Sequence, residues 1–84
     1  MSETMDKVRS IIGKFAKNKE ALHQANEETH IQKDLGVSSM NLVDIVLEFE
    51  EAFNISIADD ELATITTLGD AVKLIEAKKK VAAG

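Results

Sequence analysis

The sequence predicts an all-α fold, a four-helix bundle with three longer helices, one short helix and a long first connection. Three segments of the 84 residues repeat apolar side chains at the spacing of an amphipathic helix. Residues that cap helices stand before each of them. Only Ile55 and Ile57 alternate as a strand would, and no second convincing strand could pair with them. The length allows one domain, residues 1–84, with one small core.

The first helix is expected from Thr4 to Lys17, with Ser2 or Thr4 as its cap. Its apolar residues are Met5, Val8, Ile11, Ile12 and Phe15. Gly13 lies inside this segment and costs about 1 kcal/mol relative to alanine. Either the helix has a weak point at this glycine or another backbone segment approaches it closely.

A long polar connection follows, from Asn18 to Lys33. Its apolar residues are few and show no period. Connections of this length are uncommon in compact domains and usually have a function or contain a turn of helix. The segment from Lys19 to Gln24 could supply such a turn.

The central segment, Asp34 to Phe53, begins as a turn and continues as an unbroken helix. One face is expected to be buried: Leu42, Ile45, Val46, Phe49 and Phe53. At about 100° per residue, a second apolar set falls on nearly the opposite side: Met40, Val43 and Leu47. Four acids surround that set: Asp44, Glu48, Glu50 and Glu51. Two apolar faces on one helix indicate that it packs inward and docks a partner outward.

The last third of the sequence predicts an extended loop, a short helix and a longer one. The loop runs from Asn54 to Ala58, and Asp59 can cap a helix from Asp60 to about Thr64. Thr67 and Asp70 form a capping pair for the last helix. Its inward face is Leu68, Ala71, Val72 and Ile75. Lysines 78–80 suit a helix C-terminus, and residues 81–84 are expected to fray.

The charges are separated along the sequence, within a net charge of −5. Nine acids and no Lys or Arg lie between Asp34 and Val72, while the basic residues flank this block. An acidic field repels nucleic acid and attracts basic protein surfaces. A solvated surface that only keeps the protein soluble is the alternative, but solubility does not require acids interleaved with exposed apolar residues.

Composition excludes several classes of function. The sequence has no Cys, so disulfides, thiolate chemistry and sulfur-ligated zinc are excluded. No apolar run approaches the roughly 20 residues of a membrane span, and the first residues lack the apolar core of a signal peptide. His23 and His30 lie in the polar connection without zinc-ligand spacing, so we expect surface histidines and no metal. No catalytic constellation is recognised, and we expect no enzyme activity.

Ser39 stands at the predicted start of the central helix. A phosphate on a side chain at this position would lie beside unpaired backbone N–H groups and the positive end of the helix dipole. Spacing alone favours the alternative that Ser38 and Ser39 are only helix caps, because Ser is among the commonest cap residues.

Two stretches of the sequence carry a resemblance to a known family. The first is Asp34-Leu35-Gly36-Val37-Ser38-Ser39-Met40, with the Val43-Asp44-Ile45-Val46 helix and the Glu50-Glu51-Ala52-Phe53 ending. The second is Ile65-Thr66-Thr67-Leu68-Gly69-Asp70-Ala71. Together they resemble the acyl carrier proteins over nearly the whole chain. In that family the motif is typically D-L-G-x-D-S-L, and its serine carries 4′-phosphopantetheine through a phosphodiester. The matching residue here is Ser39.

The resemblance implies a non-enzymatic carrier whose bundle is of the acyl-carrier type. It implies that coenzyme A donates the covalent arm, that a phosphopantetheinyl transferase attaches it, and that its thiol holds acyl groups as thioesters. The other partners implied are acyl synthases, reductases and acyltransferases with basic surfaces, in fatty-acid, lipid or related biosynthesis. We expect a cytoplasmic monomer. The resemblance implies an acyl pocket lined by His30, Leu42, Val46, Phe49, Leu62 and Ile65.

Several positions depart from the family's usual residues and indicate a specialised member. Ser38 replaces Asp, Met40 replaces Leu, and Ala58 replaces Pro. His30 stands where a larger apolar or aromatic residue is usual, and the connection before Asp34 is slightly longer. The hydroxyl of Ser38 leaves modification of that residue open. An imidazole without a hydrogen-bond partner near the acyl chain predicts a short or hydroxylated cargo.

Two other functions stay open from the sequence. One is a carrier-like adaptor that has lost its modification, for which Ser38 is the motive. The other is a small acidic helical interaction module unrelated to acyl chemistry.

Overall fold

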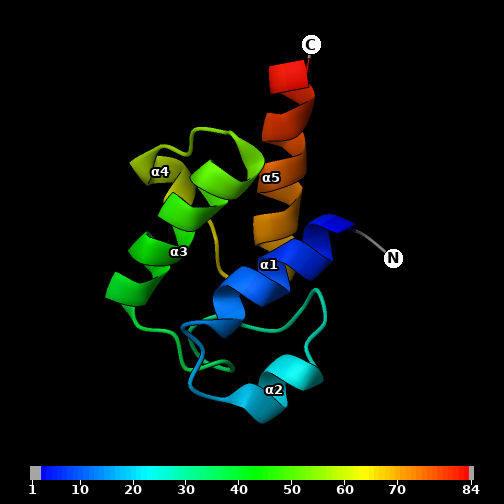
Figure 1. Ribbon diagram of the computed structural model, residues 1–84. Helices are drawn as coiled ribbons and strands as arrows, with labels where there is room; N and C mark the ends of the chain where they lie inside the picture. Colours follow the sequence, from blue (N-terminus) through cyan, green and yellow to red (C-terminus); the bar gives the residue numbers. More distant parts are fainter. Residues whose placement is uncertain (1–2, 84) are drawn as a thin grey trace.

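The computed structural model describes the backbone of residues 3–83 and the side chains of residues 3–79, and this part of the chain contains five helices (Figure 1). They are α1 (Glu3–Gly13), α2 (Lys19–His23), α3 (Ser39–Phe53), α4 (Asp59–Leu62) and α5 (Leu68–Ala83). The prediction of an all-α fold with three longer helices is confirmed. Over the described residues, the only extended pairing outside helices is one antiparallel bridge between His30 and Thr67.

The helix α1 ends at Gly13, so the prediction that it reaches Lys17 is wrong. The next N–H groups turn back into the helix: Lys14 donates to the Ile11 carbonyl at 3.2 Å, and Phe15 donates to Ile12 at 2.9 Å. A Cβ added to Gly13 would lie 3.0 Å from Cδ2 of Leu22. The close approach at this glycine is therefore made by a side chain of α2.

The long connection contains α2, a helix that raises the number of helices from the four expected to five. Asn18 is its N-cap, since Asn18 Oδ1 accepts the Ala21 N–H at 3.0 Å. At the other end, the Arg9 guanidinium donates to the carbonyls of Leu22 at 3.0 Å and His23 at 3.3 Å. These bonds satisfy carbonyls that a short helix leaves free. Figure 1 shows α2 at the end of the molecule opposite the C-terminus.

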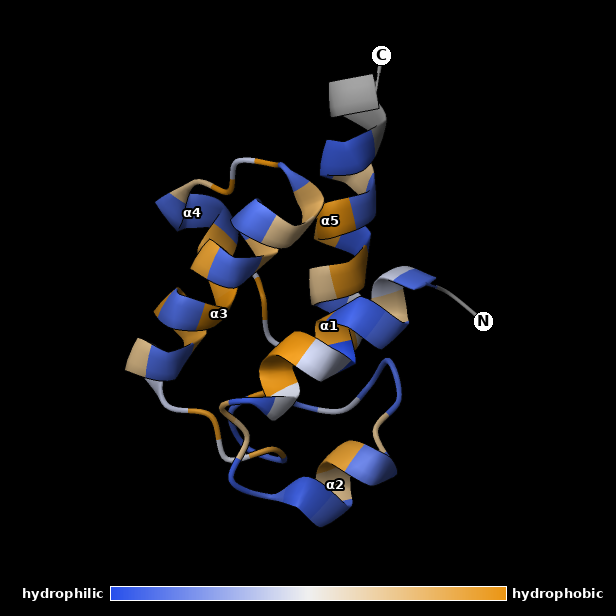
Figure 2. Ribbon diagram, in the orientation of Figure 1, coloured by the Kyte–Doolittle hydropathy of each residue, from blue (hydrophilic) through white to orange (hydrophobic). Residues whose placement is uncertain are grey.

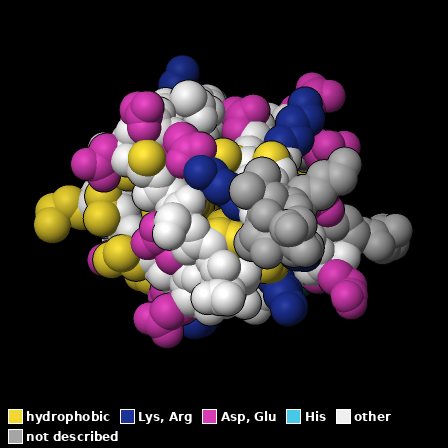
Figure 3. Space-filling view, turned by 90° about the horizontal axis from the view of Figure 1, so that it is seen from above, with side chains coloured by type: hydrophobic (Ala, Val, Ile, Leu, Met, Phe, Trp, Pro, Cys, Tyr) yellow, Lys and Arg dark blue, Asp and Glu magenta, His cyan; other side chains and the backbone are white. Residues whose placement is uncertain are grey.

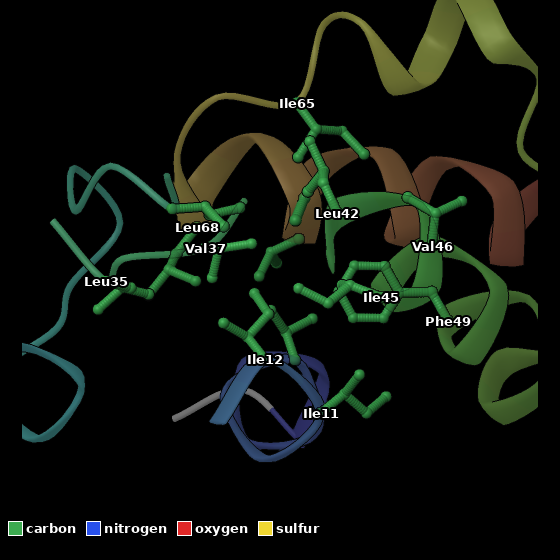
Figure 4. Packing of buried hydrophobic residues seen from close by; sticks show 14 of the residues in the cluster. Ile11, Ile12, Leu35, Val37, Leu42, Ile45, Val46, Phe49, Ile65 and Leu68 are labelled. Atoms are coloured by element: carbon green, nitrogen blue, oxygen red, sulfur yellow. The ribbon is translucent and has the colours of Figure 1, made fainter. Parts of the chain in front are cut away.

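The core lies between α1, α3 and α5 and is completed by the connection before α3. Figure 4 shows Ile11 and Ile12 of α1 facing Ile45 and Phe49 of α3. Its buried apolar residues are Val8, Ile11, Ile12, Ala16, Ile31, Leu35, Val37, Leu42, Ile45, Val46, Phe49, Ile65, Leu68, Ala71, Val72 and Ile75. Four of the five residues expected on the inner face of α3 are buried, and Phe53 is partly buried against the cluster.

The two helices after α3 begin with different caps. The extended loop before α4 is confirmed, but the cap of α4 is Ala58 and not Asp59, which is already helical. Ala58 has no side-chain oxygen, so only one half of a capping box forms here: the Ala58 N–H donates to Glu61 Oε1 at 2.9 Å. The predicted capping pair of α5 is confirmed, because Thr67 Oγ1 accepts the Asp70 N–H at 3.2 Å and Asp70 Oδ2 accepts the Thr67 N–H at 3.1 Å.

The capping bonds also act on the carboxylates that make them. The N–H of Thr67, with that of Thr66, lowers the pKa of Asp70 despite an opposing effect of burial. The Lys78 ammonium, 2.7 Å from Glu61 Oε1, lowers the pKa of Glu61 and links α4 to α5.

The helix α5 continues to Ala83, so residues 81–83 are helical where the sequence predicted fraying; Gly84 lies outside the described residues. Its later turns pack near both α1 and α3. Lys79 Nζ lies 3.3 Å from Oγ1 of the buried Thr4, and it lies over the Phe53 ring, 5.6 Å from the centroid. Lys7 of α1 lies at the same distance from that ring. None of the helices in the described part of the chain has the length and apolar character needed to cross a membrane.

Candidate functional site

The N-terminus of α3 is formed by a capping box of Ser38 and Asn41. Ser38 has an extended backbone, and its Oγ accepts the Asn41 N–H at 3.0 Å. In return, the Ser38 N–H donates to Asn41 Oδ1 at 3.3 Å. This box satisfies one of the free N–H groups of the first turn. The hydroxyl of Ser38 is therefore engaged with its own helix.

Ser39 is the first residue of α3, and its side chain is exposed. Its Oγ lies 3.3 Å from Nε2 of Gln32, which donates a hydrogen bond to it. No acid lies in the first turn of α3. The first N–H groups of a helix have no intrahelical acceptor and carry its positive end. The surroundings of Ser39 can therefore accommodate an anion such as a phosphodiester.

A tight turn before α3 sets the position of this site. Asp34 accepts the His30 N–H through Oδ2 at 2.8 Å and donates its own N–H to the His30 carbonyl at 2.9 Å. Gly36 has φ of +71°, a conformation that favours glycine. The carbonyl of Leu35 accepts N–H groups from Lys17 at 2.9 Å and Asn18 at 3.1 Å. These bonds attach the turn to the segment after α1.

The outward face of α3 carries the three exposed large apolar side chains of the described residues. Met40 is 81% exposed, Val43 47% and Leu47 55%. Figure 2 shows apolar and hydrophilic residues alternating along α3. Figure 3 shows hydrophobic side chains gathered on the side of the molecule where α3 lies, with acidic side chains around them. This surface has the exposure that a docking patch needs.

The four acids expected around this patch differ in their surroundings. Asp44 and Glu51 are exposed, and their carboxylates make no hydrogen bond or ion pair among the described residues. Glu48 pairs with Lys14 of α1 at 2.7 Å. Glu50 accepts the N–H of Ile57 through Oε2 at 2.7 Å and so fixes the loop after α3. Asp44 and Glu51 are thus free to meet a partner, whereas Glu50 has a structural bond.

Five of the six residues expected to line an acyl chain gather in one region. Leu42, Val46, Phe49 and Ile65 are buried in the core cluster, as Figure 4 shows. Leu62 of α4 is partly buried against them. In Figure 4, Ile65 lies beside Leu42, whereas Phe49 faces α1.

His30 differs from the expectation, because the structure buries its neighbour instead. Ile31 is 1% exposed and belongs to the core cluster, whereas His30 is half-buried and lies outside it. Nδ1 of His30 accepts the Lys33 N–H at 3.1 Å. The imidazole therefore has a hydrogen-bond partner, which removes the premise for a short or hydroxylated cargo.

Sequence reasoning missed three residues of this site. Asn41 could have been found, because an amide three residues after Ser38 can close a capping box as Glu or Gln does. The burial of Ile31 could have been weighed against that of His30 on hydropathy. No sequence signal indicated Gln32, since its contact with Ser39 depends on the folded turn. Among the described residues, no group of three or more His, Cys, Asp or Glu side chains could hold a metal ion.

Comparisons with known proteins agree with this arrangement. The family described as phosphopantetheine attachment site matches residues 6–75. An acyl carrier protein of Prochlorococcus marinus (strain MIT 9515) is 40% identical over 77 residues, which are 92% of this chain and 94% of that protein. The crystal structure of an acyl carrier protein from Thermotoga maritima is similar with a TM-score of 0.68 and 25% identity, over 95% of each chain.

Proposed function

We propose that Ser39 carries the phosphopantetheine arm, on the premise that this chain belongs to the phosphopantetheine attachment family and is a non-enzymatic acyl carrier protein. The arm holds acyl groups through its thiol as thioesters. The choice of Ser39 over Ser38 rests on the capping box, in which Ser38 Oγ accepts the Asn41 N–H. Modification of Ser38 would disrupt this cap, whereas Ser39 is exposed and makes no cap.

The partners of such a carrier are a phosphopantetheinyl transferase and biosynthetic enzymes. In our proposal these enzymes are acyl synthases, reductases and acyltransferases with basic surfaces, which meet the protein in the cytoplasm. They dock on the apolar patch of Met40, Val43 and Leu47, and Asp44 and Glu51 steer them. The protein acts as a monomer and a single domain, and its acidic face disfavours nucleic acid.

The acyl chain enters between α3 and the segment that joins α4 to α5. In this proposal its lining is Leu42, Val46, Phe49, Leu62 and Ile65. Each buried CH₂ contributes about 0.8 kcal/mol, so these apolar side chains favour a saturated chain. Ile31 supplies the apolar surface at the position where the sequence indicated His30.

The test is the intact mass after incubation with coenzyme A and a phosphopantetheinyl transferase. We expect the parent protein to gain one phosphopantetheine group, and Ser39→Ala to abolish this gain. Ser38→Ala removes the cap, so Ser38→Asp serves as the matched variant that keeps a cap oxygen. Both variants at Ser38 should still gain the group.

Peptide mapping then identifies the serine that carries the group. A group found on Ser38 would contradict the proposed attachment residue. A parent protein that gains no mass would instead support the alternative of a carrier-like adaptor that has lost its modification.

A further inference from the structure

Gln32 is an exposed residue whose backbone is nevertheless held on both sides. Its carbonyl accepts the Gly36 N–H at 3.2 Å. The preceding residue, Ile31, is buried and donates its N–H to the Thr66 carbonyl at 3.0 Å. The side chain of Gln32 therefore extends from a fixed point toward Ser39, where Nε2 lies 3.3 Å from Oγ.

The chemistry of this contact is directional. A glutamine amide offers two N–H donors on one nitrogen and carries no charge that changes with pH. One N–H is enough for Ser39 Oγ, which leaves the second for another oxygen nearby. A phosphodiester brings charged oxygens to this point, and hydrogen bonds to charged acceptors are roughly twice as strong as neutral ones.

We propose that Gln32 is a positioning residue for the arm. Its amide orients Ser39 Oγ before attachment, and afterwards it donates to the phosphodiester and orders the root of the arm. This inference rests on the proposed attachment to Ser39. It adds a side chain, seven residues before the serine and outside α3, that acts on the reacting oxygen.

The charges around Gln32 do not oppose this role. Asp34 is the nearest acid in the sequence, and its Oδ2 accepts the His30 N–H inside the turn. The first turn of α3 has no acid, and Ser38 brings none beside the serine. A neutral donor can therefore bind the anionic phosphodiester without a carboxylate competing for it in that turn.

The first measurement is spectroscopic and uses the full chain in its apo and holo forms. In the parent, attachment should shift the side-chain amide ¹H–¹⁵N signals of Gln32. Gln32→Met keeps the length of the side chain and removes the donor, so the ³¹P signal of its holo form should differ from that of the parent. Gln32→Lys places a hydrogen-bond donor at a similar distance from the backbone. Its holo form should therefore show the same ³¹P relaxation as the parent, which reports an ordered phosphodiester.

The matched control is Gln24→Met, the same substitution at an exposed glutamine that is the C-cap of α2. It should leave the ³¹P signal of the holo form unchanged. It also reports any general effect of replacing an exposed amide by a thioether.

The second measurement is the rate of arm attachment by the transferase. Because one hydrogen bond contributes a free energy that corresponds to roughly a 2- to 10-fold change, Gln32→Met should lower kcat by that factor. The KM for the carrier should stay at the parent value, since the amide acts on the attacking oxygen. A change in KM alone would mean that Gln32 contacts the transferase, and it would overturn the inference.

Intact mass and peptide mapping together separate this inference from the proposed function. If the parent is loaded on Ser39 but the Gln32 amide signals and the ³¹P signal of Gln32→Met stay unchanged, the inference is wrong and the carrier function stands. If the parent is not loaded on Ser39, both are wrong.

Discussion

Ile31 and His30 are adjacent residues with opposite environments. His30 forms the bridge to Thr67, and Ile31 begins the turn that continues to Leu35. Ile31 is buried in the core, and the imidazole of the half-buried His30 accepts the Lys33 N–H. An apolar and a polar residue in alternation are each placed where solvation favours them.

We predict that Ile31→Ala lowers the free energy of unfolding by about 2 to 5 kcal/mol, because it removes buried methyl groups and leaves a cavity. His30→Ala should cost about 1 kcal/mol, the net value of its bond to the Lys33 N–H. Urea denaturation of both variants measures the difference. A larger loss for His30→Ala would show that the imidazole, and not Ile31, supports the core.

At the scale of the helices, the cap of α5 contributes a stabilisation that depends on the charge of the Asp70 carboxylate. Hydrogen bonds from Thr67 and Thr66 lower the pKa of Asp70 in the folded protein. A lowered pKa means that the stabilisation is present above the ordinary aspartate pKa of about 3.9 and is lost as pH falls through the folded value. The pair thus favours the start of α5 at neutral pH.

We predict that Asp70→Asn lowers the Tm at neutral pH and flattens its fall with acid, because the variant has no carboxylate to protonate. Thermal unfolding followed from neutral pH down to about pH 3 tests this, a range that includes the ordinary aspartate pKa. Asp44→Asn is the control, since that carboxylate is exposed on α3 and caps no helix. An equal fall of Tm with acid in Asp70→Asn and the parent would contradict the role of the cap.

The helices that could be predicted are those with sustained periodicity. The bounds of α3 and the cap of α5 follow from apolar spacing and from oxygen-bearing residues at the first turn. The end of α1 could not be predicted in this way, because the N–H groups of Lys17 and Asn18 bond to the Leu35 carbonyl only in the folded chain. The cap of α4 was misplaced for a related reason: Glu61 satisfies the Ala58 N–H, so no Asp is needed at that position.

The residues of the candidate site also divide into those that spacing predicts and those that only the folded chain brings together. The position of Ser39 at the start of a helix, and two apolar faces on that helix, could be predicted from spacing. The engagement of Glu50 with Ile57 could not, because it depends on where the loop after α3 returns. Gln32 could not be chosen from a polar connection, since the turn around Gly36 alone brings it to the serine.

At the scale of the whole molecule, opposite charges are arranged along different segments. Residues 34–72 contain acids and no Lys or Arg, and the basic residues lie before and after them. Lys14 forms an ion pair with Glu48, and Lys78 forms one with Glu61, each at 2.7 Å. Exposed acids that remain unpaired give α3 a negative field that reaches a partner before contact.

We predict that reversing Asp44 and Glu51 to Lys slows loading by the transferase roughly tenfold at low salt, with a smaller deficit at high salt. Leu47→Ala should weaken docking with little salt dependence, because it removes apolar contact. Loading rates across a series of salt concentrations separate the two. Glu76→Lys, at an exposed acid on α5, is the control, and an equal effect from it would mean that only net charge matters.

The bridge between His30 and Thr67 connects two segments: the turn that leads to Ser39 and the start of α5. The Leu68 N–H donates to the Thr29 carbonyl at 3.1 Å, and the Gly69 N–H donates to the Glu27 carbonyl at 2.9 Å. Segments far apart in the chain thus share one set of backbone bonds, and we expect these bonds to break and form as a unit. The amide protons of Ile31, Leu68 and Gly69 should consequently exchange with deuterium at a common opening free energy. An opening of this unit would release the turn and the first bonds of α5 together.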